Sequence, residues 1–379
     1  MAPRAEIIAL ITSYFPAIGG AEVALRQVAE RLSAEFDFLI VTSRGRPTLP
    51  KAEFAREGLI WRLGFGSTMD RWLLPITSEA VHRRIRQRRG EGSRMILWGM
   101  DVSQASLTAS FLHRRNPDIP FVLTIQYGEA PGRLAHGRMG LIRRSFEHML
   151  GQADQVTAVS NPLAELARTH GHRGPISVIP NGVDIDRFRR DPAHGSTGGP
   201  TVVTVSRLVR KNGVDCLLQA IARLKQDVPG IVCRIIGDGP ERSSLMRLSS
   251  DLGISSSVLF LGKVLHEEIP RHLWESDIFV RPARSEGMGT AFVEAMASGL
   301  PVIGTAVGGV PDVIHDGETG LLAEVDHPDD LARKIRRVLA DKELAARLAR
   351  QGMAMVLERF DAEFVSRRYA HVFREALRG

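Results

Sequence analysis

The stretch RSEGMGTAFVEAMASGLPVI, residues 284–303, joins a glycine-containing loop, a short helical segment and an apolar run typical of a buried strand. Glycines at positions 287 and 289 allow backbone N–H groups to approach a ligand closely, and the N-terminus of the following helix adds partial positive charge. The stretch therefore predicts an anion-binding loop between two buried elements of an α/β sheet. Two carboxylates, Glu286 and Glu294, flank this loop.

Carboxylates beside an anion need a second role, because they repel the charge that the loop attracts. They can instead accept hydrogen bonds from hydroxyl groups attached to that anion, as in a sugar nucleotide. The alternative is a glycine-rich turn with solvated glutamates. If the loop binds a sugar nucleotide as the donor of its sugar, the donor-binding residues are Gly287, Met288, Gly289 and Thr290.

The same segment resembles the signature of glycosyltransferase family 4, retaining enzymes with the two-domain GT-B fold. The resemblance implies that Glu286 contacts the donor sugar and that Glu294, eight residues later, contacts the donor ribose. It extends over nearly the full chain and is strongest from Ser206 to Gly309.

Length and composition agree with a globular protein of two domains. The 379 residues are too many for one ordinary core. Apolar residues make up 44% and charged residues 25%, which excludes a disordered or fibrous protein. No segment reaches the roughly 18 apolar residues of a membrane span, and the N-terminus lacks a secretion signal. We therefore expect a cytoplasmic protein.

Short β-branched runs alternate with amphipathic stretches, which is typical of parallel sheets with crossover helices. We predict two Rossmann-like, doubly wound parallel-sheet domains facing across a cleft, the GT-B architecture: residues 1–188 plus 361–379, a linker at 189–199, and residues 200–360. The return of the last helix to the first domain is implied by the resemblance. Expected strands are 7–12, 38–42, 95–98, 121–124, 155–158, 177–179, 201–205, 232–236, 258–261, 278–280 and 302–305, and expected helices include 21–35, 162–169, 329–358 and 362–377.

Basic residues follow the strand at 201–205, at the sheet edge where open α/β folds bind ligands. Arg207 can fork onto phosphate oxygens and Lys211 adds a mobile point charge. The segment resembles the family motif Gly-Arg-Leu-x-x-x-Lys-Gly, with Ser206 for the first glycine and Asn212 inserted before Gly213. Val264, after the strand at 258–261, and Gly237, after that at 232–236, are further candidates for the donor pocket.

The first domain carries a second pair of glycines, Gly19 and Gly20, just before a predicted helix, where phosphate or acceptor can approach. Most family members have a histidine near the reacting sugar, and here Gln126 takes that place. Glutamine can hydrogen-bond a hydroxyl but cannot titrate. Glu129 is a candidate polar neighbour for positioning the acceptor or sugar.

No metal or cofactor is expected. Asp184-Ile185-Asp186 has the Asp-x-Asp pattern that binds a metal ion in a different glycosyltransferase fold. Here the string continues a turn near the linker, so we do not expect it to bind a metal. Cys216 and Cys233 lack a CxxC neighbour, which favours buried apolar packing.

These features predict a hexosyltransferase-type enzyme that moves a sugar from a nucleoside diphosphate sugar, of UDP or GDP type, to a glycan, lipid-linked or small-molecule acceptor. Arg207, Lys211 and Glu286 would be the catalytic residues. The alternatives are a GT-B sugar-nucleotide epimerase and a non-catalytic relative that binds a sugar nucleotide.

The net charge of +7 and the arginine-rich run at 83–94 have two possible interpretations. A basic face can attract an anionic membrane surface, which would place the protein at the inner face of the membrane. The alternative is an ordinary solvated helix face. No nucleic-acid module accompanies the run, so no nucleic-acid partner is expected.

Overall fold

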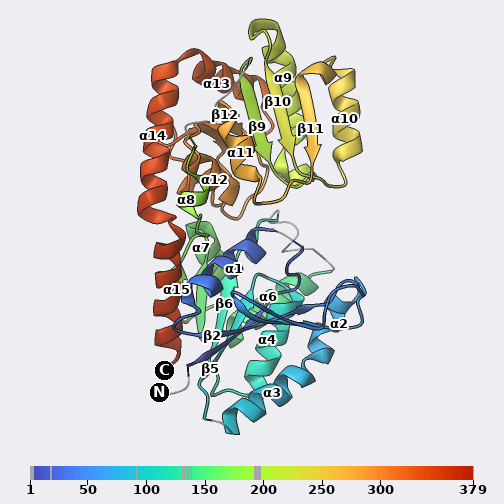
Figure 1. The fold of residues 1–379 in the computed structure, drawn as a ribbon, viewed down its shortest axis with the longest axis vertical. Coiled ribbons are helices and arrows are strands. Elements are labelled where there is room, and N and C mark those ends of the chain that lie inside the picture. Colours follow the sequence, from blue (N-terminus) through green and yellow to red (C-terminus); the bar gives the residue numbers. More distant parts are fainter. Residues whose placement is uncertain are drawn as a thin grey trace. The chain divides into compact units, whose positions relative to one another are not determined.

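The computed structural model describes residues 4–17, 19–90, 92–129, 134, 137, 139–191 and 198–378. Contacts divide the chain into two compact units (Figure 1). The first comprises Met1–Tyr127, Pro131–Gly182 and Ala362–Gly379, and the second comprises Gly128–Ala130 and Val183–Asp361. Residues 183–188, which the sequence prediction assigns to the first domain, therefore group with the second unit. Of the predicted linker 189–199, residues 192–197 lie outside the described residues.

The first unit is built on a sheet whose strands, among the described residues, have the order β3-β4-β2-β1-β5-β6-β7-β8. All neighbours pair in parallel except β3 and β4, which form an antiparallel hairpin at one edge. The strands are β1 Glu6–Leu10, β2 Asp37–Ser43, β3 Ala52–Ala55, β4 Gly58–Leu63, β5 Met95–Met100, β6 Phe121–Ile125, β7 Gln155–Ala158 and β8 Ile176–Val178.

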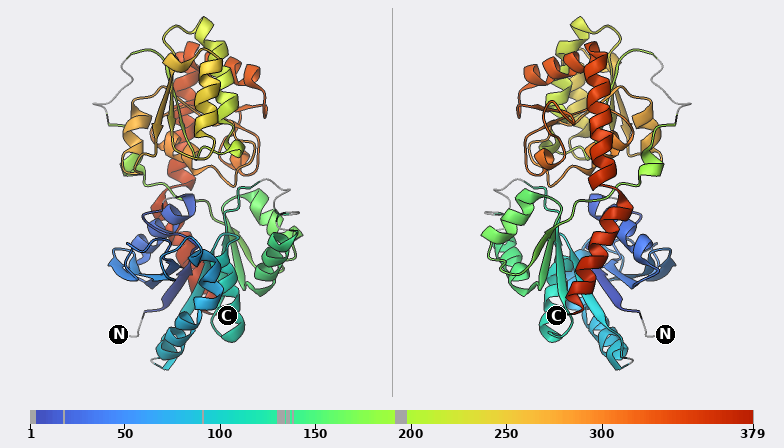
Figure 2. Two further views of the ribbon diagram at one scale, coloured as in Figure 1. Left: turned by 90° about the vertical axis from the view of Figure 1, so that its right-hand side faces the viewer. Right: turned by 90° about the vertical axis from the view of Figure 1, so that its left-hand side faces the viewer.

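Central strands β1, β5 and β6 are buried at every position, because helices cover both faces of a parallel sheet. Helix α1 packs with α15, and α4 packs with α2 and α6 (Figure 2). In the core, the Trp98 ring lies 5.3 Å from Tyr369 and 5.1 Å from Phe373 of α15. The helices are α1 Gly20–Leu32, α2 Asp70–Thr77, α3 Glu79–Gly90, α4 Gln104–Arg115, α6 Leu141–Gln152, α7 Asn161–Thr169 and α15 Ala362–Ala376.

The second unit has a wholly parallel sheet with the order β11-β10-β9-β12-β13-β14. Its strands are β9 Thr201–Val205, β10 Val232–Ile236, β11 Val258–Gly262, β12 Ile278–Val280, β13 Val302–Thr305 and β14 Leu321–Ala323. Its helices are α8 Ile185–Phe188, η1 Arg210–Asn212, α9 Val214–Asp227, α10 Arg242–Asp251, η2 Ser255–Ser257, α11 Ile269–Trp274, α12 Thr290–Ala297, η3 Val310–Asp312, α13 Pro328–Ala340 and α14 Lys342–Arg359.

The predicted α/β class with two parallel sheets is confirmed, and three details differ. The hairpin β3–β4 and the short strand β14 were not predicted. The single helix expected at 329–358 is two helices, α13 and α14, because the chain leaves helical geometry at Asp341. The Asp341 carboxylate accepts a hydrogen bond from the N–H group of Leu344 at 2.9 Å and thereby starts α14.

Candidate functional site

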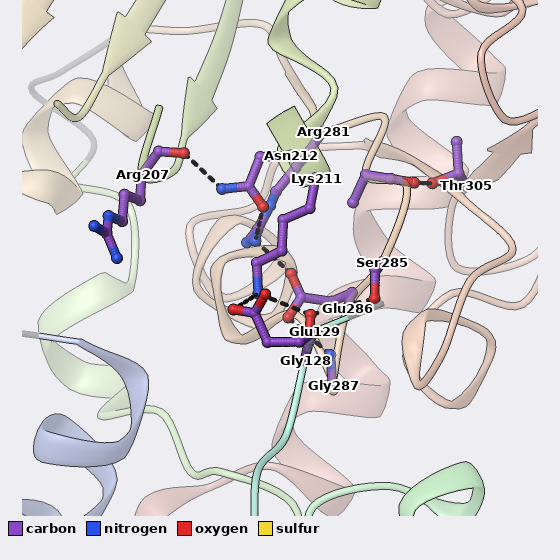
Figure 3. Close-up of polar contacts among 11 residues, drawn as sticks. Gly128, Glu129, Arg207, Lys211, Asn212, Arg281, Ser285, Glu286, Gly287 and Thr305 are labelled. Carbon is purple, nitrogen blue, oxygen red and sulfur yellow. Dashed lines mark hydrogen bonds and ion pairs between the residues drawn. The ribbon is translucent and has the colours of Figure 1, made fainter. Parts of the chain in front are cut away.

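Two neighbouring strands of the second sheet, β9 and β12, carry most of the predicted donor residues. Strand β9 leads into η1 and α9, and β12 leads into the glycine loop and α12. Because these strands are parallel neighbours, their carboxyl ends lie at the same edge, where open α/β sheets bind ligands. Figure 3 shows the side chains that gather there.

Lys211, in η1, contacts a carboxylate within this site. Its Nζ atom donates to the carbonyl oxygen of Gly128 at 2.7 Å and to Oε1 of Glu129 at 3.2 Å (Figure 3). Glu129, which the sequence prediction places on the acceptor side, thus belongs to the second unit. An anionic ligand of Lys211 would have to compete with this carboxylate.

Asn212, the residue inserted relative to the family motif, has two hydrogen-bond partners. Its Nδ2 atom donates to the backbone carbonyl of Arg207 at 2.6 Å, and its Oδ1 accepts from Nη2 of Arg281 at 3.1 Å. Asn212 is 2% exposed. The side chain of Arg207 is exposed, and its guanidinium points away from Glu286 in Figure 3. The inserted residue therefore shapes the backbone that carries Arg207.

The predicted anion-binding loop leads directly into α12. Gly289 precedes the helix with φ of 87°, in the left-handed region that favours glycine. Gly287 and Met288 are buried, and Thr290 at the start of the helix is half-buried. The N–H group of Gly287 donates to Oε1 of Glu286 at 3.0 Å, so one loop donor already serves a protein carboxylate.

The other oxygen of Glu286, Oε2, forms an ion pair with Arg281. The side chains are 12% exposed for Arg281 and 15% for Glu286. Breaking such a pair leaves one buried charge uncompensated, which is costly. Asn212, Arg281 and Glu286 thus form a polar chain from η1 to the glycine loop. Arg281 was not predicted, although a charge directly after an apolar strand was an available signal.

Glu294, predicted to contact ribose, lies in α12 and is 8% exposed. Its Oε1 lies 2.8 Å from Nε2 of His266, which follows β11. Val264, in the same loop, is half-buried. A Cβ on Gly237 would lie 1.9 Å from the carbonyl oxygen of Ser206, so glycine permits the loops after β9 and β10 to approach.

Arg284 fixes the other side of the glycine loop. Its guanidinium donates to the two carboxylate oxygens of Asp215 at 2.8 and 2.7 Å, and to Oδ1 of Asp326 at 2.6 Å. Burial alone would raise the pKa of Asp215, but hydrogen bonds from Arg284 and backbone N–H groups hold that pKa below its usual value. The pair therefore ties α9 to the loop.

In the first unit, Gly19 and Gly20 lie exposed at the N-terminus of α1. Glu22, in the first turn, accepts a hydrogen bond from Oγ of Ser13 at 2.6 Å. Burial raises the pKa of Glu22 above its usual value. A phosphate at this helix end would meet both the glycine N–H groups and this carboxyl.

Gln126, directly after β6, is held by two neighbours. Its Oε1 accepts from Nδ2 of Asn181 at 3.1 Å, and its backbone N–H donates to Oδ1 of Asp101 at 3.3 Å. Its Nε2 is buried without a hydrogen-bond partner among the described residues. A buried unpaired donor calls for an explanation, and a sugar hydroxyl would supply an acceptor.

Among the described residues, no three His, Cys, Asp or Glu side chains form a group suited to a metal ion. Within the Asp-Ile-Asp string, Asp184 caps α8 through the N–H group of Arg187 at 3.3 Å. Both cysteines are buried and free, and burial raises the pKa of Cys216 to about 11 and that of Cys233 to about 12. These thiols pack as apolar groups.

Two family models match consecutive parts of the chain. Glycosyltransferase Family 4 matches residues 18–187, and Glycosyl transferases group 1 matches residues 186–355. Together the two models span residues 18–355. The chain belongs to the glycosyltransferases of the family 4 type, which confirms the resemblance seen in the sequence.

Similar curated proteins come from several bacteria. The GDP-mannose-dependent alpha-(1-6)-phosphatidylinositol monomannoside mannosyltransferase of Mycolicibacterium smegmatis is 33% identical over 57% of this chain and 61% of its own length. The N-acetyl-alpha-D-glucosaminyl L-malate synthase of Bacillus anthracis is 33% identical over 63% of each. The matched region thus covers about three fifths of the length of these relatives.

Solved structures share the fold. Sucrose-phosphate synthase from Thermosynechococcus elongatus has a TM-score of 0.83 and 23% identity, covering 98% of this chain and 99% of its own. Anabaena Alr3699/HepE in complex with UDP and glucose has a TM-score of 0.80 and 20% identity, covering 98% and 100%. The fold is GT-B.

Proposed function

We propose that this chain is a retaining glycosyltransferase that moves a sugar from a UDP- or GDP-type sugar nucleotide to an acceptor, without a metal. One observation carries the proposal: Lys211, Glu286 and the loop before α12 meet at the carboxyl edge of one parallel sheet (Figure 3). This combination of a cation, a helix N-terminus and a carboxylate suits an anion that carries hydroxyl groups.

In the proposed reaction, the bond between the sugar anomeric carbon and the diphosphate oxygen breaks, and a bond to the acceptor oxygen forms on the same face. The acceptor proton passes to the departing phosphate oxygen, so no protein base is required. Arg207, Lys211 and the N–H groups at the start of α12 would stabilise the leaving diphosphate, and Glu286 would hold a sugar hydroxyl. Gln126 would position the sugar through its unpaired Nε2 donor.

Donor binding is tested by thermal unfolding with UDP-, GDP- and ADP-sugars in the presence of a chelator. A ligand at a hundredfold excess over its Kd stabilises by about 2.7 kcal/mol. We expect a shift with one nucleotide, and a Kd about 10- to 100-fold weaker in Arg207→Ala, which loses a charge-assisted contact. The matched control is Arg247→Ala, an exposed arginine on α10. No shift with any nucleotide would contradict the proposal.

For the acceptor, we propose an amphiphilic, lipid-linked molecule presented at an anionic membrane surface. The loops after β4 and β6 expose large apolar side chains, with Phe65 80%, Met69 59% and Met139 94% exposed. Exposed arginines Arg46 and Arg71 lie in the loop after β2 and in α2. Exposed apolar side chains and exposed cations on one unit are features that suit a lipid interface. No helix in the described part of the chain is both long and apolar enough to span a membrane.

The arginine-rich run contributes less to this surface than its sequence suggests. Arg84 lies 2.8 Å and Arg88 3.4 Å from the carboxylate of Glu6, which is 3% exposed. These two arginines therefore stabilise the first unit, whereas Arg83 and Arg86 remain exposed.

Co-sedimentation with anionic vesicles at low and high salt tests the membrane proposal. We expect salt-sensitive binding that Phe65→Ser combined with Met69→Ser weakens. Leu357→Ser, which changes a 51% exposed residue of α14, serves as the control. Binding that is absent, or unaffected by the double change, would contradict the proposal.

A further inference from the structure

The loop after β11 places a histidine against the carboxylate that the proposed function assigns to the donor ribose. Nε2 of His266 lies 2.8 Å from Oε1 of Glu294. The side chains are 14% exposed for His266 and 11% for Glu294. The contact is therefore a largely buried hydrogen bond between the end of β11 and α12.

The direction of this hydrogen bond follows from the chemistry of its partners. An ionised carboxylate only accepts hydrogen bonds, so Nε2 of His266 must carry the proton and donate. This holds for the Nε2–H tautomer and for the protonated ring alike. Oε1 of Glu294 is thereby engaged, and Oε2 forms no hydrogen bond within the described part of the chain, so it can accept one from a ligand.

The imidazole ring is itself held in place by packing. Its centre lies 5.7 Å from the ring of Phe188, which is fully buried. The carbonyl oxygen of Phe188 accepts a hydrogen bond from Nε1 of Trp274 at 2.8 Å. A donor anchored in this way fixes the rotamer of the carboxylate that it contacts.

We propose that His266 is a positioning residue that orients Glu294 toward a ribose hydroxyl of the nucleotide donor. The inference rests on the proposed function, because it requires the donor to bind beside α12. Without His266, the carboxylate would sample other rotamers and would have to be ordered when ligand binds, which lowers affinity. Packing alone would not require a polar pair here, since an apolar pair fills such a space at less cost.

The test titrates UDP, GDP and ADP, each with its 2′-deoxy and 3′-deoxy counterpart, into the full-length protein by calorimetry. In the wild type, we expect removal of one ribose hydroxyl to weaken binding about tenfold. In His266→Ala, we expect the ribonucleotide to bind about tenfold more weakly and the discrimination against the deoxy form to fall to less than about twofold. A purely structural role would lower stability without removing this discrimination.

Two further variants serve as a rescue and as a control. His266→Gln retains an N–H donor at similar reach and should restore most of the discrimination. His315→Ala, which changes a 43% exposed histidine of the same unit, should bind like the wild type. Undiminished discrimination in His266→Ala, or failure of the glutamine variant to restore it, would overturn this inference alone. Failure of the wild type to bind any of the three diphosphates would overturn the proposed function and this inference with it.

Discussion

Replacing Asn212 with alanine should destabilise the second unit and weaken donor binding together. The change removes the hydrogen bonds to the Arg207 carbonyl, at 2.6 Å, and from Arg281, at 3.1 Å. Each buried group left without its partner costs about 1–3 kcal/mol. Arg281 keeps its ion pair with Glu286, so the cost of its lost hydrogen bond lies at the low end of this range. We therefore expect a total loss of about 2–4 kcal/mol in the free energy of unfolding.

Urea unfolding followed by far-ultraviolet circular dichroism measures the free energy of unfolding, and calorimetry with UDP and GDP measures nucleotide affinity. The matched control is Asn116→Ala. Asn116 is 1% exposed in the first unit, donates to the Leu112 carbonyl at 2.8 Å and lies 3.2 Å from Nδ1 of His82. It should lose comparable stability but keep its nucleotide affinity. A loss below about 0.5 kcal/mol in Asn212→Ala, within the range of ordinary surface substitutions, together with unchanged nucleotide affinity, would refute the proposed polar chain.

Two further predictions concern the same unit. Gly213→Ala should cost more than about 3 kcal/mol in unfolding experiments, because φ is 67° and the new Cβ would lie 1.8 Å from the Pro282 carbonyl oxygen. Gly253→Ala, at φ of 66° in open space, should cost only the left-handed strain of about 1–2 kcal/mol, and equal losses in both would contradict the steric argument. Because the folded pKa of Asp215 is lowered, its contact with Arg284 stabilises fully above the ordinary Asp pKa and is lost as pH falls through the folded value. Asp215→Asn should thus be less stable at neutral pH, and the difference should shrink below about pH 4 in acid unfolding.

The central strands could be predicted closely, since they are short, mostly apolar runs that are largely buried. The bounds of β9, β10, β12 and β13 agree with the sequence prediction. The hairpin β3–β4 was not predicted because it lies at the sheet edge, where burial is incomplete. Glu53 and Arg62 also interrupt its apolar pattern. The break between α13 and α14 escaped because one aspartate cap within a continuous amphipathic pattern gives little local signal.

The candidate site was predictable where chemistry is local and not where it depends on distant partners. The glycine loop and Glu286 form one continuous segment whose residue types already indicate an anion and a hydroxyl acceptor. The contacts of Asn212 with Arg281 and of His266 with Glu294 join residues that are 69 and 28 positions apart, so no spacing within the chain reveals them. Asn212 reads as an insertion in sequence and becomes a buried bridge only when η1 folds beside β12.

Retaining sugar transfer is tested most directly by following an anomerically defined UDP- or GDP-sugar by NMR in the presence of a lipid-linked acceptor. We expect release of the nucleoside diphosphate that depends on acceptor, and a product whose anomeric configuration equals that of the donor. Glu286→Gln should abolish the transfer. An inverted product would contradict the retaining mechanism, and conversion of the sugar nucleotide without acceptor would identify an epimerase instead.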